Sequence, residues 1–187
     1  LAEAVPPRDA EAGTVLAARA QRLIDAGAIE PAFALLERAG VAGVPALARL
    51  RFDAALLMGS EVPVCAEFGA NPRLAPDYAA RVFCLARTGD WPAAELTLQS
   101  ARTLDEIDPA RAALLARFLN DGEETAAILP PPRDLTPLDI RLSEAVGEPL
   151  PVSSLPRAYT GTALDGHAGW KSQLEAAERL ARAGALD

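Results

Sequence analysis

The stretch LARTGDWPAAELTLQSARTLDEIDP, residues 85–109, contains the end of one predicted helix, a turn and the whole of the next helix. A Gly-Asp-Trp turn at 89–91 separates two segments in which apolar residues follow helical spacing. In the second segment the small residues Ala94 and Ala101 flank Leu98 at steps of four and three, which puts all of them on one helix face. Small residues let two helices approach closely, and larger ones fill the groove between them. The stretch therefore predicts two antiparallel helices.

The same pattern recurs along the chain with a period of about 31 residues, which is typical of stacked helical hairpins. Proline fits the first turn of a helix, and glycine takes the left-handed conformation that ends one. Glycines expected to end helices are Gly27, Gly40, Gly59, Gly69, Gly89, Gly147 and Gly184. The predicted helix pairs are 9–26 with 30–39, 45–58 with 60–69, 76–88 with 90–103, 109–119 with 121–129, and 136–146 with a weak 153–161, followed by a helix at 167–183.

Helix starts carry a second signal, because Asp108 and Thr136 each precede a proline that opens an apolar pattern. Their side-chain oxygens are expected to accept hydrogen bonds from the exposed amides of the first turn. Strand-like alternation is not sustained anywhere in the sequence, so the expected fold class is all-α.

The stretch at 85–109 resembles one unit of the tetratricopeptide-repeat class of α-solenoid, through its turn and its small–large–small order. An earlier unit agrees with the pattern through Ala32, Leu36 and Ala39, whereas the unit at Gly59 departs from it. The resemblance implies a right-handed superhelical stack of about five antiparallel hairpins with a long concave surface. It implies no particular ligand.

The expected organisation is a single helical-repeat domain over 1–187. Regular hairpins occupy 1–129, a Pro-rich irregular elbow occupies 130–166, and 167–187 holds a final helix and the start of a further hairpin. Prolines as dense as those of the elbow prevent long helices. The elbow is too apolar for a solvated linker, although a mobile linker is the alternative. We interpret the chain as a piece of a longer protein.

Composition narrows the class of function. The chain has 41 alanines and 27 leucines, 5% aromatic residues and a net charge of −8. An acidic chain repels phosphate backbones, so we expect no nucleic-acid partner. No apolar run approaches the ~18 residues of a membrane span. Only one of the 18 basic residues is a lysine, Lys171, which favours a GC-rich bacterial source.

Two cysteines, Cys65 and Cys84, lie nearly equidistant from the turn between two predicted helices. Antiparallel packing of those helices would bring them side by side, so they form a candidate disulfide. The alternative is that both are small buried hydrophobic residues. No CxxC pattern exists and the only histidine, His167, is distant in sequence, so we expect no metal site.

We expect no catalytic or cofactor-binding residues, and no cofactor. No glycine loop of the phosphate-binding type occurs, and no nucleophile pairs with His167. Trp170 and Trp91 both lie near predicted helix starts. They are candidate residues of a groove that binds a partner peptide, and the alternative is packing between neighbouring hairpins.

The first functional hypothesis is a non-catalytic protein- or peptide-binding scaffold module of a larger bacterial protein, in which a partner docks into a groove. The alternative is an accessory superhelical domain of a cell-wall-active enzyme, because the helical superhelices attached to lytic transglycosylases look broadly similar. A third hypothesis is a self-associating structural protein. The cysteines favour an exported, periplasmic location over a cytoplasmic one.

Overall fold

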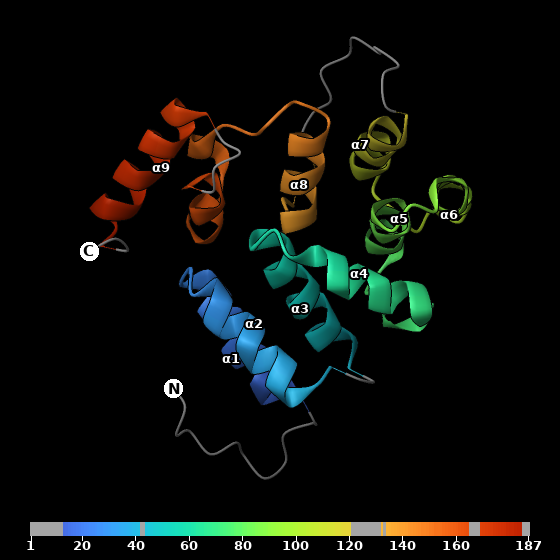
Figure 1. Ribbon diagram of the computed structural model, residues 1–187, viewed down its shortest axis with the longest axis horizontal. Coiled ribbons are helices and arrows are strands. Elements are labelled where there is room, and N and C mark those ends of the chain that lie inside the picture. Colours follow the sequence, from blue (N-terminus) through green and yellow to red (C-terminus); the bar gives the residue numbers. More distant parts are fainter. Residues whose placement is uncertain (1–12, 42–43, 121–131, 133, 165–168, 185–187) are drawn as a thin grey trace. The chain divides into compact units, whose positions relative to one another are not determined.

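The computed structural model describes residues 13–41, 44–120, 132, 134–164 and 169–184, and these residues form two compact units. Unit 1 comprises Leu1–Met58 and Leu150–Asp187, and unit 2 comprises Gly59–Pro149. Every regular element within the described ranges is a helix (Figure 1), so the predicted all-α class is confirmed. No helix in this part of the chain is long and apolar enough to cross a membrane.

Unit 1 joins the first three helices to the last segment of the chain. Its elements are α1 (Thr14–Asp25), α2 (Ile29–Ala39), α3 (Pro45–Leu57), two 3₁₀ helices η2 (Val152–Ser154) and η3 (Arg157–Leu164), and α9 (Trp170–Arg182). Helices α1, α2 and α3 contact one another, and η3 contacts both α1 and α9. The C-terminal segment therefore packs against the N-terminal helices, although residues 59–149 lie between them in sequence.

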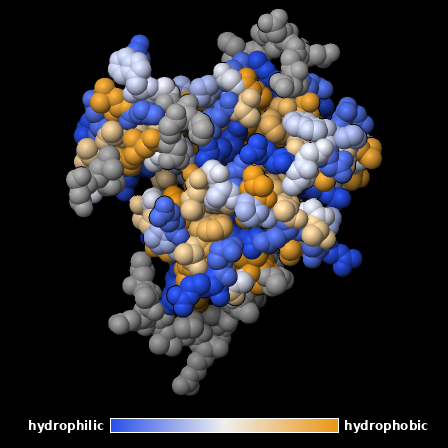
Figure 2. Space-filling view, viewed as in Figure 1, coloured by the Kyte–Doolittle hydropathy of each residue, from blue (hydrophilic) through white to orange (hydrophobic). Residues whose placement is uncertain are grey.

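The core of unit 1 forms where the alanine and leucine faces of α1 to α3 meet. Ile24, Leu36 and Leu47 are buried at its centre, and Tyr159 of η3 packs against the same cluster. A second, smaller cluster of Val152, Ala163 and Ala176 lies under α9. Ala176 is the single buried residue of α9, so this helix is held by few core side chains. Figure 2 shows hydrophobic side chains exposed where α9 lies in Figure 1.

Unit 2 contains the middle helices. Its elements are α4 (Glu61–Ala70), the 3₁₀ helix η1 (Pro72–Leu74), α5 (Tyr78–Arg87), α6 (Trp91–Thr103), α7 (Pro109–Leu119) and α8 (Pro137–Ala145). Helix α5 packs against α4, α6 and α7, and α7 packs against α8. The predicted pair 76–88 with 90–103 corresponds to α5 and α6, and its expected contact residues Ala94, Leu98 and Ala101 are all buried in α6.

The helix predicted at 60–69 is α4 to within one residue at each end, but two other local predictions were wrong. Gly69 does not end a helix: it lies inside α4, which continues to Ala70. The following Asn71 has a φ of −139° and a ψ of 89°, outside the helical region, because the residue before a proline is disfavoured there. The weak helix at 153–161 consists instead of the two short 3₁₀ helices η2 and η3.

Several sequence predictions are not tested by the structure. The predicted helix at 121–129 and His167 lie outside the described residues. The superhelical stack of about five hairpins and the single domain over 1–187 also stay predictions.

Candidate functional site

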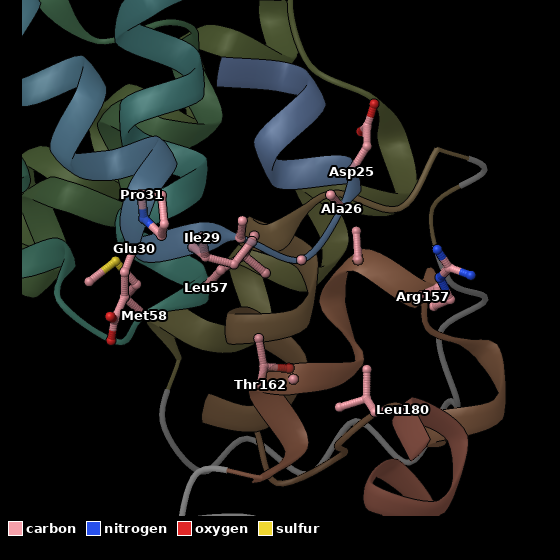
Figure 3. A pocket seen from close by; sticks show the side chains of 14 residues that line it. Asp25, Ala26, Ile29, Glu30, Pro31, Leu57, Met58, Arg157, Thr162 and Leu180 are labelled. Carbon is pink, nitrogen blue, oxygen red and sulfur yellow. The ribbon is translucent and has the colours of Figure 1, made fainter. Parts of the chain in front are cut away.

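Unit 1 contains a cleft of about 450 Å³ between the α1–α2 turn and the 3₁₀ helix η3 (Figure 3). Its walls come from residues 25–31, from the end of α3 at Leu57 and Met58, from the 157–162 part of η3, and from Leu180 of α9. Sites that bind small molecules or peptide side chains have volumes of about 300–1,000 Å³. The cleft is therefore large enough to hold a few side chains of a partner.

The turn between α1 and α2, which forms one wall, is held by backbone hydrogen bonds. Gly27 has a φ of 78°, in the left-handed region that favours glycine. The amide of Ala28 donates to the carbonyl of Leu23 at 2.8 Å, and the amide of Gly27 donates to Ile24 at 2.8 Å. These two bonds make a Schellman motif, which ends α1 at Asp25 and lets α2 begin at Ile29, after three intervening residues. The wall is thus set by backbone hydrogen bonds.

More of the lining of the cleft is apolar than polar. Ile29, Leu57, Met58 and Leu180 present aliphatic or thioether groups to it. On the opposite wall, Gly161 has no side chain, and a Cβ added there would meet no atom within 4 Å. A larger side chain can therefore be introduced at this position of the lining without a clash at its Cβ. A methionine in the floor adds a flexible surface that can adapt to different side chains.

The charged residues of the cleft lie at its rim. Asp25, Glu30 and Arg157 line it and are exposed. Figure 3 shows Glu30 beside Met58 at one end and Arg157 at the other. Glu30 lies in the first turn of α2, where a carboxylate is favourably placed against the helix dipole. The cleft therefore has charged residues on both sides, with Asp25 and Arg157 opposite Glu30.

Tyr159 is the residue of η3 that anchors this wall to the core. Burial raises the pKa of its phenol above the ordinary value of 10.0, and the negative charges of Asp53 and Asp25 raise it further. The phenol therefore stays protonated at neutral pH. Asp25 also lines the cleft, so one of the two carboxylates that raise the pKa of Tyr159 belongs to the candidate site.

The structure brings the two cysteines together in unit 2. Cys65 of α4 and Cys84 of α5 have their sulfur atoms 2.02 Å apart, across a separation of 19 residues. Both side chains are buried. The bond ties the two helices across the Asn71–Pro72 turn, which is the geometry that the sequence spacing suggested.

The two tryptophans belong to different units. Trp91 starts α6 in unit 2, is 45% exposed, and has its ring centroid 5.8 Å from that of Phe118. Trp170 starts α9 in unit 1 and is 70% exposed. Neither residue lines the cleft described above. Their role as residues of a partner groove stays a prediction.

Sequence reasoning missed one buried ion pair, between α7 and α8. Arg111 donates from Nε to Oδ1 of Asp139 at 2.7 Å and from Nη2 to Oδ2 at 2.8 Å. Asp139 also closes a capping box with Thr136, whose amide donates to Oδ2 at 2.8 Å. The Asp139 hydrogen bond, above all, raises the pKa of Arg111. The order Thr-x-x-Asp at 136–139 was a local sequence signal for the capping box. No such signal pointed to Arg111 as the partner of Asp139, because it lies 28 residues earlier in the chain.

The cleft itself was also missed, because its walls come from segments that no local pattern connects. The apolar spacing of 9–26 and 30–39 predicted the helices that flank the turn, but gave no reason to place 157–162 opposite them. Among the described residues, no group of three or more His, Cys, Asp or Glu side chains is arranged to hold a metal ion.

Comparison with known proteins gave no match in a scan against protein-family models, a search of curated proteins or a search of solved structures.

Proposed function

We propose that this chain is a non-catalytic protein- or peptide-binding module of a larger bacterial protein, and that the cleft of unit 1 holds a peptide of the partner. The observation that carries the proposal is the cleft of about 450 Å³, which apolar side chains line together with the exposed charged residues Asp25, Glu30 and Arg157. Peptide sites combine apolar pockets that supply affinity with a few polar groups that fix orientation.

The lining indicates the chemistry of the peptide. Ile29, Leu57 and Leu180 form a floor suited to one aliphatic or aromatic side chain. Asp25 and Glu30 outnumber Arg157 at the rim, which favours a basic residue next to that anchor. We therefore expect a peptide with an apolar residue flanked by lysine or arginine.

The tetratricopeptide-like architecture is part of the same proposal. Its support is the burial of Ala94, Leu98 and Ala101 in α6, where a repeat of this class places small, large and small contact residues. An exported, periplasmic location is proposed with it. Its support is the proximity of Cys65 and Cys84, since disulfides persist in oxidising compartments.

The cleft can be filled without changing its other residues. Gly161→Leu adds a side chain into open space, and the φ of this glycine is not in the left-handed region. Gly69→Leu is a matched control, because it makes the same change at an exposed glycine in α4 with no atom near its Cβ. Both variants should fold, as checked by circular dichroism.

The test is to select peptides from a random displayed library on the immobilised chain and to measure their affinities for the variants. We expect the selected peptides to carry the apolar–basic pattern. Gly161→Leu should weaken their binding at least about tenfold, or about 1.4 kcal/mol, and Gly69→Leu should leave it unchanged. If no peptide is enriched, or if the enriched peptides bind Gly161→Leu as well as the unaltered chain, the proposal is wrong.

A further inference from the structure

Helix α9 presents an apolar face that the described part of unit 1 does not cover. Trp170 is 70% exposed and Leu174 is 53% exposed, whereas Ala176 of the same helix is 0% exposed. The sequence periodicity places Trp170, Leu174, Ala177 and Ala181 on one stripe. The stripe lies beside the buried side of the helix rather than on it. We call these four residues the α9 seam.

The α9 seam has the spacing of a coiled coil. Its residues are separated by four, three and four positions, which is the heptad alternation of the a and d positions. The first half of the seam carries the large residues Trp170 and Leu174, and the second half carries the small residues Ala177 and Ala181. Large and small side chains are thus segregated along one helix.

The order of large and small residues along the α9 seam is self-complementary in an antiparallel pair of helices. In an antiparallel pair of α9 helices, Trp170 of one copy lies over Ala181 of the other, and Leu174 lies over Ala177. Each large side chain then meets a small one, so the two helices can approach closely along the whole seam. A parallel pair would stack Trp170 on Trp170 and leave alanine against alanine.

The charges beside the seam are complementary in the same arrangement. Lys171 and Glu178 are exposed and directly follow Trp170 and Ala177, which the 4-3-4 spacing makes d positions, so both are e positions of the heptad. In antiparallel coiled coils the e positions of the two helices face each other. Lys171 of one copy therefore lies near Glu178 of the other, and the two-fold axis produces this ion pair twice.

We propose that α9 is a homodimerisation element, in which a second copy of this chain binds antiparallel along the α9 seam. None of the four seam residues lines the cleft, so this surface is additional to the proposed peptide site. One pair of 13-residue helices is a small interface. Interfaces below about 1,200 Å² belong to weak and transient associations, so the dimer should form in a concentration-dependent way.

The antiparallel geometry can be tested by chemical cross-linking, because Lys171 is the only lysine in the chain. A zero-length carbodiimide converts an ammonium and a carboxylate in contact into an amide. We expect it to produce a covalent dimer of the full chain, with a Lys171–Glu178 link identified by mass spectrometry of the digested product. Lys171→Arg should still dimerise in sedimentation but should lose this cross-link, since guanidinium does not form the amide.

Sedimentation equilibrium from about 10 µM to about 1 mM, the range of weak affinities, measures the association itself. Leu174→Glu should weaken it at least about tenfold, because a carboxylate would enter the apolar seam. Leu96→Glu is the matched control, since Leu96 is 65% exposed on α6 and lies outside the seam. That control should associate like the unaltered chain.

Charge reversal tests the antiparallel register. Lys171→Glu should weaken association about threefold to tenfold, as expected for two exposed ion pairs, and Lys171→Glu combined with Glu178→Lys should restore it. A chain that stays monomeric at about 1 mM, or a dimer that Leu174→Glu does not affect, would overturn the proposal. A dimer cross-linked through other carboxylates, or one that the double reversal does not restore, would overturn the antiparallel register.

Discussion

At the scale of single residues, the disulfide Cys65–Cys84 joins α4 to α5, and the ion pair Arg111–Asp139 joins α7 to α8. The proximity of Cys65 and Cys84 followed from their equal distance from one turn, because antiparallel packing converts that symmetry into contact. The pair Arg111–Asp139 could not be anticipated in the same way. Its partners lie on α7 and α8, and no sequence pattern fixes the register of those two helices.

The disulfide should be a large contribution to the stability of unit 2. A cross-link over a separation of 19 residues restricts the unfolded chain by about 3 kcal/mol. Cys65→Ala combined with Cys84→Ala should lower the free energy of unfolding by about this amount in urea titrations, and reduction of the unaltered chain should have the same effect. In mass spectrometry, protein isolated from its native compartment should have a mass two hydrogens below that of the reduced chain. Free thiols in that protein would contradict the exported location.

The buried ion pair Arg111–Asp139 should contribute more to the stability of unit 2 than the exposed pair Arg117–Glu148. The Asp139 side chain is 0% exposed, so Asp139→Asn leaves Arg111 without its charged partner and should cost about 3 kcal/mol of unfolding free energy. Glu148→Gln is the matched control. Glu148 pairs with Arg117 at 2.7 Å but is 46% exposed, and its loss should cost less than about 1 kcal/mol. Equal losses in chemical denaturation would show that burial does not decide the difference.

Tyr159 should make unit 1 sensitive to alkaline pH. Because the pKa of the folded phenol lies above 10.0, its contribution to stability is fully present below that pH and is lost as pH rises through the folded pKa. In Tyr78→Phe, absorbance titration reports Tyr159 alone and should give a pKa above 10.0. Adding Asp25→Asn should lower that pKa, since Asp25 is one of the two carboxylates that raise it. A pKa unaffected by this change would contradict the placement of Asp25 near the phenol.

At the scale of elements, prolines and glycines predicted most helix boundaries to within two residues. The predicted 45–58 became α3 (Pro45–Leu57), and 109–119 became α7 (Pro109–Leu119). The reason is local, since proline opens a helix and left-handed glycine ends one within a few residues. The exception at Gly69 shows the limit of the rule, because a glycine has no helix-ending effect when the next residues continue the helical hydrogen bonds.

Helix α9 shows what periodicity alone cannot determine. The stripe of Trp170, Leu174 and their neighbours predicted an amphipathic helix, and α9 is one. Periodicity does not say which part of an apolar face is covered. In unit 1 the covering residues of η2 and η3 reach Ala176, while Trp170 and Leu174 stay exposed.

At the scale of the whole molecule, the least predictable feature is that unit 1 is formed by two segments far apart in the sequence. Helices α1 to α3 join a segment that begins at Leu150, and this return of the chain creates the cleft. The entropic cost of closing so long a loop rises only slowly with its length. Tertiary packing can therefore join distant segments without leaving a local trace in the sequence. For this reason the helices were predictable and the candidate site was not.

The most direct test of the proposed function is to map a selected apolar–basic peptide onto the ¹⁵N-labelled chain by NMR. The perturbed amides should cluster in residues 25–31, at Leu57 and Met58, and along 157–162, and Gly161→Leu should strongly reduce these changes at the same peptide concentration. Perturbations confined to unit 2, or unaltered in Gly161→Leu, would contradict the assignment of the cleft as the peptide site.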